Sequence, residues 1–581
     1  MHGEKTVQMI DCGGGARLER GVRCRMSDGV ELVSDHFYPP QDDVHAGPQP
    51  TLLMRQPYGR DIASTVVYAH PVWFARQGYN VVIQDVRGRG DSGGEFYPFR
   101  HEGRDGAETI AWLRTRPESN GRVGMYGFSY QGMTQLLAAA QRPEGLQCIA
   151  PGMTACDLYH GWFYSRSGAL RLASSLGWGL QMLKEDARRR KLREASDRLE
   201  QAWANLAAQT SVLPFREHPA LHGEGVPQYV VDWFDHAEPG EYWREMDVIE
   251  PLYHINVPAL HVSGWYDTYL EGSIAGFLYA RNYFAEPARA HQYLIAGPWL
   301  HIPWGDRVGA ADFGAEALID TDAILLRWFD HWLKDSGEFA REPKIRHFVL
   351  GENRWRDADT FPTDANHHLY LHSGGRANSR KGDGTLSLAR PADDEPCDVF
   401  VYDPEVPVVA PGGVAAASGQ FDQATLELGN NVLVYTSEPL AQPLYILGYP
   451  RVVLFCSSSA AHTDFTAKLV RVKPGGAAEF ICIGIARSSR LFSETGYSAD
   501  RIHPWIFLLE PTSCRFAPGE RIRLEIASSA FPLYDRNPGT AVPSCRATSW
   551  DWRRSTQFVY HDGTHASALH LPIIEAGEAT P

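Results

Sequence analysis

The chain has 581 residues, of which 44% are hydrophobic and 22% are charged, an ordinary composition for a globular protein. Single hydrophobic cores stop growing at roughly 250–300 residues, so about two or three domains are expected. The net charge of −15 argues against nucleic acid and anionic membranes, which bind basic surfaces. Neither a signal peptide nor an apolar run of membrane-spanning length, about 18 residues, is seen, so neither is expected.

The nine cysteines are scattered along the chain and form no C-x-x-C pair, so a zinc ribbon or a redox dithiol is not expected. Several lie in apolar runs, for example Cys456 in VVLFC and Cys482 in FICIGI, as buried free thiols do. Free thiols are typical of a reducing compartment, and a cytoplasmic location is therefore predicted. No residue pattern implies a metal or an organic cofactor.

The first third of the chain alternates strand and helix patterns. Two strand-like segments, 22–26 and 30–38, flank Asp28-Gly29, which is a common hairpin turn pair. Further strands are predicted at 51–55, 79–85 and 123–126. Helices are predicted at 62–76, 102–114 and 132–140. This alternation indicates a mostly parallel sheet that is covered by helices.

The character of the sequence then changes twice. Residues 151–245 are interpreted as a helical cap, because 180–208 has uninterrupted helical propensity. Strand patterns return at 257–264 and 292–296, and a helix over 320–334 closes this part. From 346 onward, short alternating strands are separated by Gly, Pro and Asn-Asn, which favours a jelly roll or sandwich. These strands are predicted at 346–350, 368–372, 431–435, 451–457, 466–472, 480–487 and 521–528. The predicted domains are a core of 1–150 and 246–345, the cap at 151–245 and an all-β domain at 346–581.

Two serines lie in motifs typical of a catalytic nucleophile. The string GDSGG around Ser92 matches G-x-S-x-G literally, whereas GFSYQG around Ser129 misses it by one residue. A nucleophile elbow needs a strand before the serine and a helix after it, because the helix N-terminus presents N–H groups to an oxyanion. Only Ser129 has both neighbours, and Ser92 is interpreted as part of a Gly-rich structural turn. Ser129 is therefore predicted to be the nucleophile of an α/β-hydrolase.

A serine nucleophile needs a base and an acid, and in α/β-hydrolases the chain order is Ser, Asp or Glu, His. The next two buried strands after Ser129 end in GWYD and GPWLH, which place Asp267 and His301 on loops past strand ends. Three alternatives fit the order or the strand ends less well: His261, His291 and Asp306. With 23 histidines and 70 acidic residues, spacing alone leaves other pairs open.

A series of sequence blocks extends along most of the chain: MSDGVEL, RQPYGR, DVRGRGDSGGEF, YGFSYQG, GWYD, GPWLH, RWFDHWLKD, GENRW, YDPEVPV, NNVLVYTSEPL and TDFTAKLVRV. In this order they resemble the family of serine hydrolases that contains cocaine esterases, X-prolyl dipeptidyl-peptidases and α-amino-acid ester hydrolases. The resemblance implies an α/β-hydrolase core, an inserted helical cap and a C-terminal jelly roll of the galactose-binding-like type. This outline agrees with the segments derived above.

The resemblance also implies roles for individual residues. Ser129 matches the nucleophile of the family, Asp267 its acid and His301 its base. Tyr58, the tyrosine of RQPYGR, matches a residue whose hydroxyl donates to the oxyanion. The backbone N–H of Tyr130 would be the second donor.

Aromatic side chains are predicted to shape the acyl pocket. Trp162, Phe163 and Trp178 lie in the cap sequence, and Tyr269 follows the acid by two positions. Trp162 and Trp178 match aromatic pocket positions in the esterase branch of the family. Aromatic walls suit a benzoyl or bulky aliphatic acyl group. The alternative is that these rings only join the cap to the core.

The predicted function is cleavage of an ester or amide of a small organic substrate through an acyl-enzyme on Ser129. Acyl transfer to an amine or alcohol is one alternative. A dipeptidyl-peptidase-like or aminoacyl-ester activity is another, although family members that hold a free ammonium use carboxylates beside the acid. Here the three residues after Asp267 are not acidic. A homo-oligomer, dimer or tetramer, is expected because the family tends to form them, and no nucleic-acid or membrane partner is expected.

Overall fold

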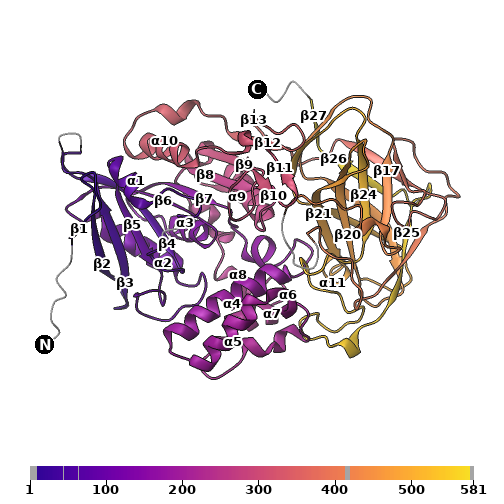
Figure 1. The fold of residues 1–581 in the computed structure, drawn as a ribbon, viewed down its shortest axis with the longest axis horizontal. Helices are drawn as coiled ribbons and strands as arrows, with labels where there is room; N and C mark the ends of the chain where they lie inside the picture. Colours follow the sequence, from indigo (N-terminus) through magenta and orange to yellow (C-terminus); the bar gives the residue numbers. More distant parts are fainter. Residues whose placement is uncertain (1–8, 43–44, 63–64, 413–418, 576–581) are drawn as a thin grey trace.

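The computed structural model describes residues 9–42, 45–62, 65–412 and 419–575. Figure 1 shows an α/β region that carries the N-terminus, a group of helices beneath it and a β-rich region that carries the C-terminus. None of the helices in these described ranges combines the length and apolar character needed to cross a membrane.

A sheet of 11 strands forms the α/β region, in the order β1-β2-β3-β5-β4-β6-β7-β8-β9-β12-β13. Its strands are β1 (Met9–Asp11), β2 (Arg17–Arg25), β3 (Glu31–Tyr38), β4 (Gln49–Gln56), β5 (Asn80–Asp85), β6 (Ser119–Phe128), β7 (Leu146–Gly152), β8 (Ala259–Gly264), β9 (Gln292–Gly297), β12 (Ile345–Val349) and β13 (Arg354–Ala358). The strands from β5 to β12 pair in parallel. They are largely apolar because helices cover both faces. The fold class predicted from the sequence, an α/β-hydrolase core with a cap and an all-β domain, is confirmed.

The helices of the core are α1 (Pro71–Arg76), α2 (Glu102–Arg114), α3 (Tyr130–Ala140), α9 (Leu270–Tyr283) and α10 (Thr321–Leu333). Successive residues of β4 point to opposite faces of the sheet. Leu53 joins a hydrophobic cluster with residues of α2 and α3, whereas Leu52 and Met54 join one with residues of α1 and α10. The sheet therefore has an independent core on each face.

Four differences from the sequence prediction concern the core. The helix predicted at 62–76 is confined to α1, and the strand β7 and the helix α9 were not predicted. The segment 346–350, assigned to the all-β domain, corresponds to β12 and pairs in parallel with β9. Its alternating pattern resembles that of the later strands, but β12 and β13 complete the first sheet, which therefore extends past the predicted boundary at 346.

The cap follows β7 and contains a π-helical turn (Tyr159–Phe163), α4 (Leu172–Arg189), α5 (Arg193–Ala204), α6 (Leu206–Gln209), α7 (Tyr229–Asp235) and α8 (Glu241–Arg244). The continuous helix predicted over 180–208 is broken between α4 and α5. Lys191 adopts a φ of 62° there, which ends α4 and turns the chain back along it.

The C-terminal region is all-β and contains a large sheet and a small one. The large sheet consists of β14 (His367–His372), β15 (Thr385–Ser387), β16 (Asp398–Tyr402), β17 (Leu433–Ser437), β19 (Arg451–Ser458), β20 (Asp464–Val472), β21 (Ala478–Arg487), β22 (His503–Leu508), β24 (Arg521–Ala527), β25 (Ser555–Tyr560) and β26 (Ala568–Leu571). The small one consists of β18 (Leu444–Gly448), β23 (Thr512–Phe516) and β27 (Ile573–Ile574). The short pieces β10 (Arg307–Val308), β11 (Ala311–Asp312) and α11 (Ser488–Leu491) lie outside these layers.

Candidate active site

The turn between β6 and α3 has the geometry of a nucleophile elbow. Ser129 adopts φ 62° and ψ −129°, a strained conformation for a residue with a side chain. Its backbone N–H donates to the carbonyl oxygen of Gly152 at 2.8 Å. The glycines of GFSYQG are needed for close approach: a Cβ on Gly132 would lie 2.7 Å from the Cβ of Thr154.

Ser92, the serine of the literal motif, is fully buried and structural. Its hydroxyl donates to the carbonyl oxygen of Asp85 at 2.7 Å and accepts from the backbone N–H of Val33 at 2.8 Å. Because this hydroxyl already donates one hydrogen bond, accepts another and has no exposed surface, it is not available as a nucleophile. This agrees with the interpretation of Ser92 as part of a structural turn.

The structure brings Ser129, His301 and Asp267 together. His301 Nε2 lies 3.0 Å from Ser129 Oγ, and His301 Nδ1 lies 2.8 Å from Asp267 Oδ1. The acid follows β8 and the base follows β9, which are neighbouring parallel strands, so their carboxyl ends meet at one edge of the sheet. The Asp267 side chain is fully buried, whereas that of His301 is 27% exposed and open to a substrate. This arrangement can move a proton from the serine to the imidazole while the carboxylate fixes the ring tautomer.

Tyr58 lies in the loop after β4, beside the elbow. Burial raises the pKa of Tyr58, and interactions with Trp178 and Ser129 oppose part of that rise. The phenol is therefore protonated at neutral pH and able to donate a hydrogen bond. Tyr130 begins α3, where a backbone N–H has no acceptor within the helix and can face an oxyanion.

The loop that carries Tyr58 is anchored by Arg60, whose role sequence reasoning missed. The guanidinium forms ion pairs with Asp35 at 2.8 Å, Asp85 at 2.6 Å and Asp91 at 2.7 Å. Two of these carboxylates, Asp85 and Asp91, belong to the block DVRGRGDSGGEF, and Arg60 is the last residue of the block RQPYGR. The sequence had therefore singled out both blocks, but it did not show that they pair.

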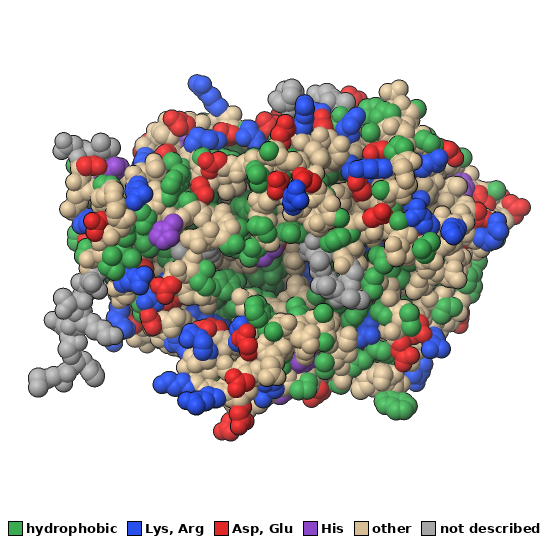
Figure 2. All heavy atoms as spheres, viewed as in Figure 1, with side chains coloured by type: hydrophobic (Ala, Val, Ile, Leu, Met, Phe, Trp, Pro, Cys, Tyr) green, Lys and Arg blue, Asp and Glu red, His purple; other side chains and the backbone are tan. Residues whose placement is uncertain are grey.

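Aromatic rings form a wall beside the catalytic residues. Tyr269 lies edge-on to the His301 ring at 5.1 Å and stacks on Trp162 at 4.2 Å. Trp178 stacks on Trp233 at 5.3 Å, and Phe99 lies 5.0 Å from Trp162. Phe99 and Trp233 are themselves buried and pack against the predicted aromatic residues. Figure 2 shows a hollow with a largely hydrophobic floor near the centre of the molecule, between the cap below and the core above.

Phe163 requires a correction. Its side chain has no exposed surface and packs against Trp233 at 4.5 Å and Trp243 at 5.2 Å inside the cap. It therefore supports the aromatic wall from behind and presents no surface to a substrate. Both Phe163 and its neighbour Trp162 lie in the π-helical turn, and both rings contact Trp178.

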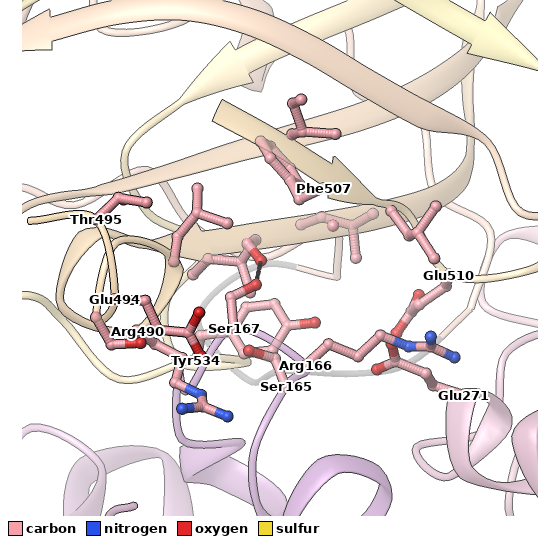
Figure 3. Close-up of a pocket in the computed structure, with 17 residues that line it drawn as sticks. Ser165, Arg166, Ser167, Glu271, Arg490, Glu494, Thr495, Phe507, Glu510 and Tyr534 are labelled. Carbon is pink, nitrogen blue, oxygen red and sulfur yellow. Dashed lines mark hydrogen bonds and ion pairs between the residues drawn. The ribbon is translucent and has the colours of Figure 1, made fainter. Parts of the chain in front are cut away.

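Glu271, the first acidic residue after Asp267 in the chain, is neutralised by two arginines. Its carboxylate oxygens lie 2.5 Å from Arg166 Nε and 2.7 Å from Arg171 Nη2. Glu510 of the β-region faces Arg171 at 3.6 Å, and burial raises the pKa of Glu510 to about 7. Arg166, Glu271 and Glu510 line a separate cavity of about 450 Å³ between the cap, α9 and the β-region, and neither Ser129, Asp267 nor His301 lines it (Figure 3).

The fold and this hydrogen-bonded trio define the class of the protein: it is a serine hydrolase of the α/β-hydrolase type. Residues 28–303 match the X-Pro dipeptidyl-peptidase (S15) family, and residues 337–570 match the X-Pro dipeptidyl-peptidase C-terminal non-catalytic domain.

The chain is also similar to known proteins over nearly its whole length. It is 35% identical over 590 residues to the cocaine esterase of Rhodococcus sp. (strain MB1 Bresler), covering 98% of this chain and 100% of that protein. A solved α-amino acid ester hydrolase is similar with a TM-score of 0.80 and 26% identity, covering 99% and 100% of the two chains. An aminopeptidase from a Thaumarchaeota archaeon has a TM-score of 0.78 and 25% identity, covering 96% and 97%. The chain therefore belongs to the family of cocaine esterase and X-Pro dipeptidyl-peptidase.

Proposed function

We propose that this hydrolase cleaves its substrate in two steps through an acyl-enzyme on Ser129. The hydrogen-bond chain Ser129–His301–Asp267 carries this proposal. His301 takes the proton of the serine hydroxyl as the oxygen attacks the carbonyl carbon, and later gives it to the leaving group. The Tyr58 hydroxyl and the Tyr130 N–H stabilise the oxyanion of the tetrahedral intermediate. Water activated by His301 then releases the acid.

The substrate class we propose is an ester or amide with an uncharged, aromatic or bulky acyl group. Support comes from the wall of Trp162, Trp178 and Tyr269, which offers apolar faces next to the base. A free ammonium would find no carboxylate there, because Glu271 is already paired with Arg166 and Arg171. One relative is named for cocaine and one for α-amino acid esters, and the neutral wall of this chain favours the former type of substrate.

A labelling experiment tests the acyl-enzyme. A fluorophosphonate probe should label the wild-type chain on Ser129, and p-nitrophenyl benzoate should be hydrolysed. Ser129→Ala should lose both signals, whereas Ser92→Ala, the matched control at the literal motif, should keep both. Labelling on Ser92, or full turnover by Ser129→Ala, would contradict the proposal.

Two further proposals concern the location of the protein and its oligomeric state. We infer a cytoplasmic location because all nine cysteines are free thiols, most of them buried, as in reducing compartments. A homo-oligomer is proposed from the tendency of the family. Size-exclusion chromatography with light scattering tests it, and a monomeric mass would contradict it.

A further inference from the structure

The two proposed oxyanion donors come from different elements, and the backbone does not join these elements at the site. Tyr58 follows the end of β4, and Tyr130 follows the end of β6. The ladder between β4 and β6 ends at the pair Leu53–Met125, before the strands end at Gln56 and Phe128. The distance between the donors must therefore be set by side chains in the gap.

Two buried glutamines fill this gap with a chain of hydrogen bonds. The backbone N–H of Phe128 donates to Gln131 Oε1 at 3.1 Å. Gln131 Nε2 donates to Gln56 Oε1 at 3.1 Å, and Gln56 Nε2 donates to the carbonyl oxygen of Gly59 at 3.1 Å. Phe128 precedes the nucleophile and Gly59 follows Tyr58, so the chain connects the residues that flank the two groups.

The direction of this chain is fixed at both ends. The Phe128 N–H can only donate and the Gly59 carbonyl can only accept, so both amides must point the same way. Gln56 and Gln131 have no exposed surface, which excludes water as a substitute partner. The elbow also makes room for this arrangement: a Cβ on Gly127 would lie 2.8 Å from Gln131 Oε1.

A second set of interactions also connects β4 with α3, through Arg55 and Tyr130, which adjoin Gln56 and Gln131 in the chain. The Tyr130 hydroxyl donates to Glu102 Oε1 at 2.8 Å, and Glu102 is paired with Arg55 at 2.8 Å. The backbone N–H of Phe99 donates to the Tyr130 hydroxyl at 3.0 Å. The last two residues of β4, Arg55 and Gln56, are thus connected to the first two of α3, Tyr130 and Gln131. The hydrogen bonds of its side chain fix the position of Tyr130.

We propose that Gln56 and Gln131 are positioning residues that set the distance between the Tyr58 hydroxyl and the elbow. The inference rests on the proposed function, because it assigns the glutamines an effect that acts through the oxyanion. Both glutamines belong to sequence blocks noted above, RQPYGR and YGFSYQG, in which neither had a role. An amide relay of this kind affects kcat more than KM, since the oxyanion bonds strengthen in the transition state.

The test is a comparison of Gln131→Met and Gln56→Met in two backgrounds, wild type and Tyr58→Phe. Displacing a donor by about 1 Å can reduce the rate by about 10²-fold. In the wild-type background we expect kcat for p-nitrophenyl acetate to fall roughly 10- to 100-fold, with KM changed by less than about threefold. In the Tyr58→Phe background the donor is already gone, so each substitution should lower kcat by less than about threefold.

Gln135→Met is the matched control. Gln135 is a fully buried glutamine one turn further along α3, and its amide donates to the carbonyl oxygens of Gly127 at 3.0 Å and Gln131 at 3.1 Å and accepts from the Ala150 N–H, so its hydrogen bonds stay on the α3 side of the gap. Its substitution should change kcat by the same factor in both backgrounds. If circular dichroism shows that Gln131→Met does not fold, the two backgrounds are compared with Gln56→Met alone and with the double variant Gln56→Met/Gln131→Met.

The outcomes separate this inference from the proposed function. Equal losses in both backgrounds, or an unchanged kcat in the wild-type background, would overturn the positioning role while leaving the acyl-enzyme intact. Absence of fluorophosphonate labelling on Ser129 in the wild-type chain would overturn the proposed function itself. Active-site titration with the same probe gives the concentration of competent enzyme, so that misfolded material does not lower kcat.

Discussion

Replacing the buried carboxylate of Asp267 by a carboxamide tests the proton-transfer mechanism most directly. When Ser129 attacks, His301 becomes an imidazolium whose Nδ1 lies 2.8 Å from Asp267 Oδ1. At an effective dielectric constant of about 20, unit charges at this distance attract by on the order of 6 kcal/mol. Asp267→Asn removes this attraction and lets the imidazole adopt the wrong tautomer. Since about 1.4 kcal/mol corresponds to a factor of ten, kcat should fall by about 10⁴-fold.

The assay is steady-state hydrolysis of p-nitrophenyl benzoate, with the rate of fluorophosphonate labelling as an independent measure of serine reactivity. Both rates should fall, and the thermal unfolding midpoint should show that Asp267→Asn is folded. Asp306→Asn is the matched control, because this acid follows His301 in the chain, whereas the ring nitrogens of His301 face Asp267 and Ser129. A loss of less than about tenfold for Asp267→Asn, or an equal loss for Asp306→Asn, would refute the assignment.

Three further predictions concern turn, pocket and pH. Ser92→Ala should lower the free energy of unfolding by about 1–3 kcal/mol, because the Val33 N–H loses its acceptor, and kcat should change by less than about twofold. Chemical denaturation measures the first effect and steady-state kinetics the second, and a folded but inactive variant would contradict the prediction. Trp162→Ala should lower kcat/KM about tenfold more for p-nitrophenyl benzoate than for p-nitrophenyl acetate, through loss of aromatic contact; equal losses would remove Trp162 from the pocket. The raised pKa of Glu510, about 7, means that the folded state binds a proton more tightly than the unfolded state, so this group lowers stability as pH rises from about 4.5 to 7. Glu510→Gln should therefore raise the thermal unfolding midpoint more at pH 8 than at pH 5, and the difference should correspond to at most about 3 kcal/mol. A larger rise at pH 5 than at pH 8 would contradict this and show that the ion pair with Arg171 dominates.

Sequence patterns predicted best the elements that have one face in the core and the opposite face in solvent. The helix at 102–114 was placed at its observed bounds because one face contacts the sheet and the other faces solvent. The strand β7 was not predicted, and its last two residues, Pro151-Gly152, lie in the range 151–245 that was assigned to the cap. The strand β12 was assigned to the wrong region because alternation identifies a strand but does not identify its neighbours.

The site shows the same division between local and non-local information. The choice of Ser129 over Ser92 needed only the strand and helix on either side of it. The order of Asp267 and His301 needed the fold class. The burial of Phe163 depends on Trp233 and Trp243, which lie about 70 to 80 positions later in the chain, so no local pattern indicated it. The relay between Gln56 and Gln131 joins residues 75 positions apart, which no local pattern connects.

The same non-local packing decides which charges are available to a substrate. Glu271 lies on the first turn of α9, four positions after Asp267, the proposed acid, and is the first acidic residue after it in the chain. In the fold, Arg166 and Arg171 of the cap region occupy both of its carboxylate oxygens. Arg171 also faces Glu510 of the β-region, so this cluster joins three regions of the chain. A carboxylate that holds the cap, the core and the β-region together cannot also bind a substrate cation without loosening that junction. The proposed selectivity for uncharged acyl groups and the assembly of the three regions would therefore depend on the same ion pairs.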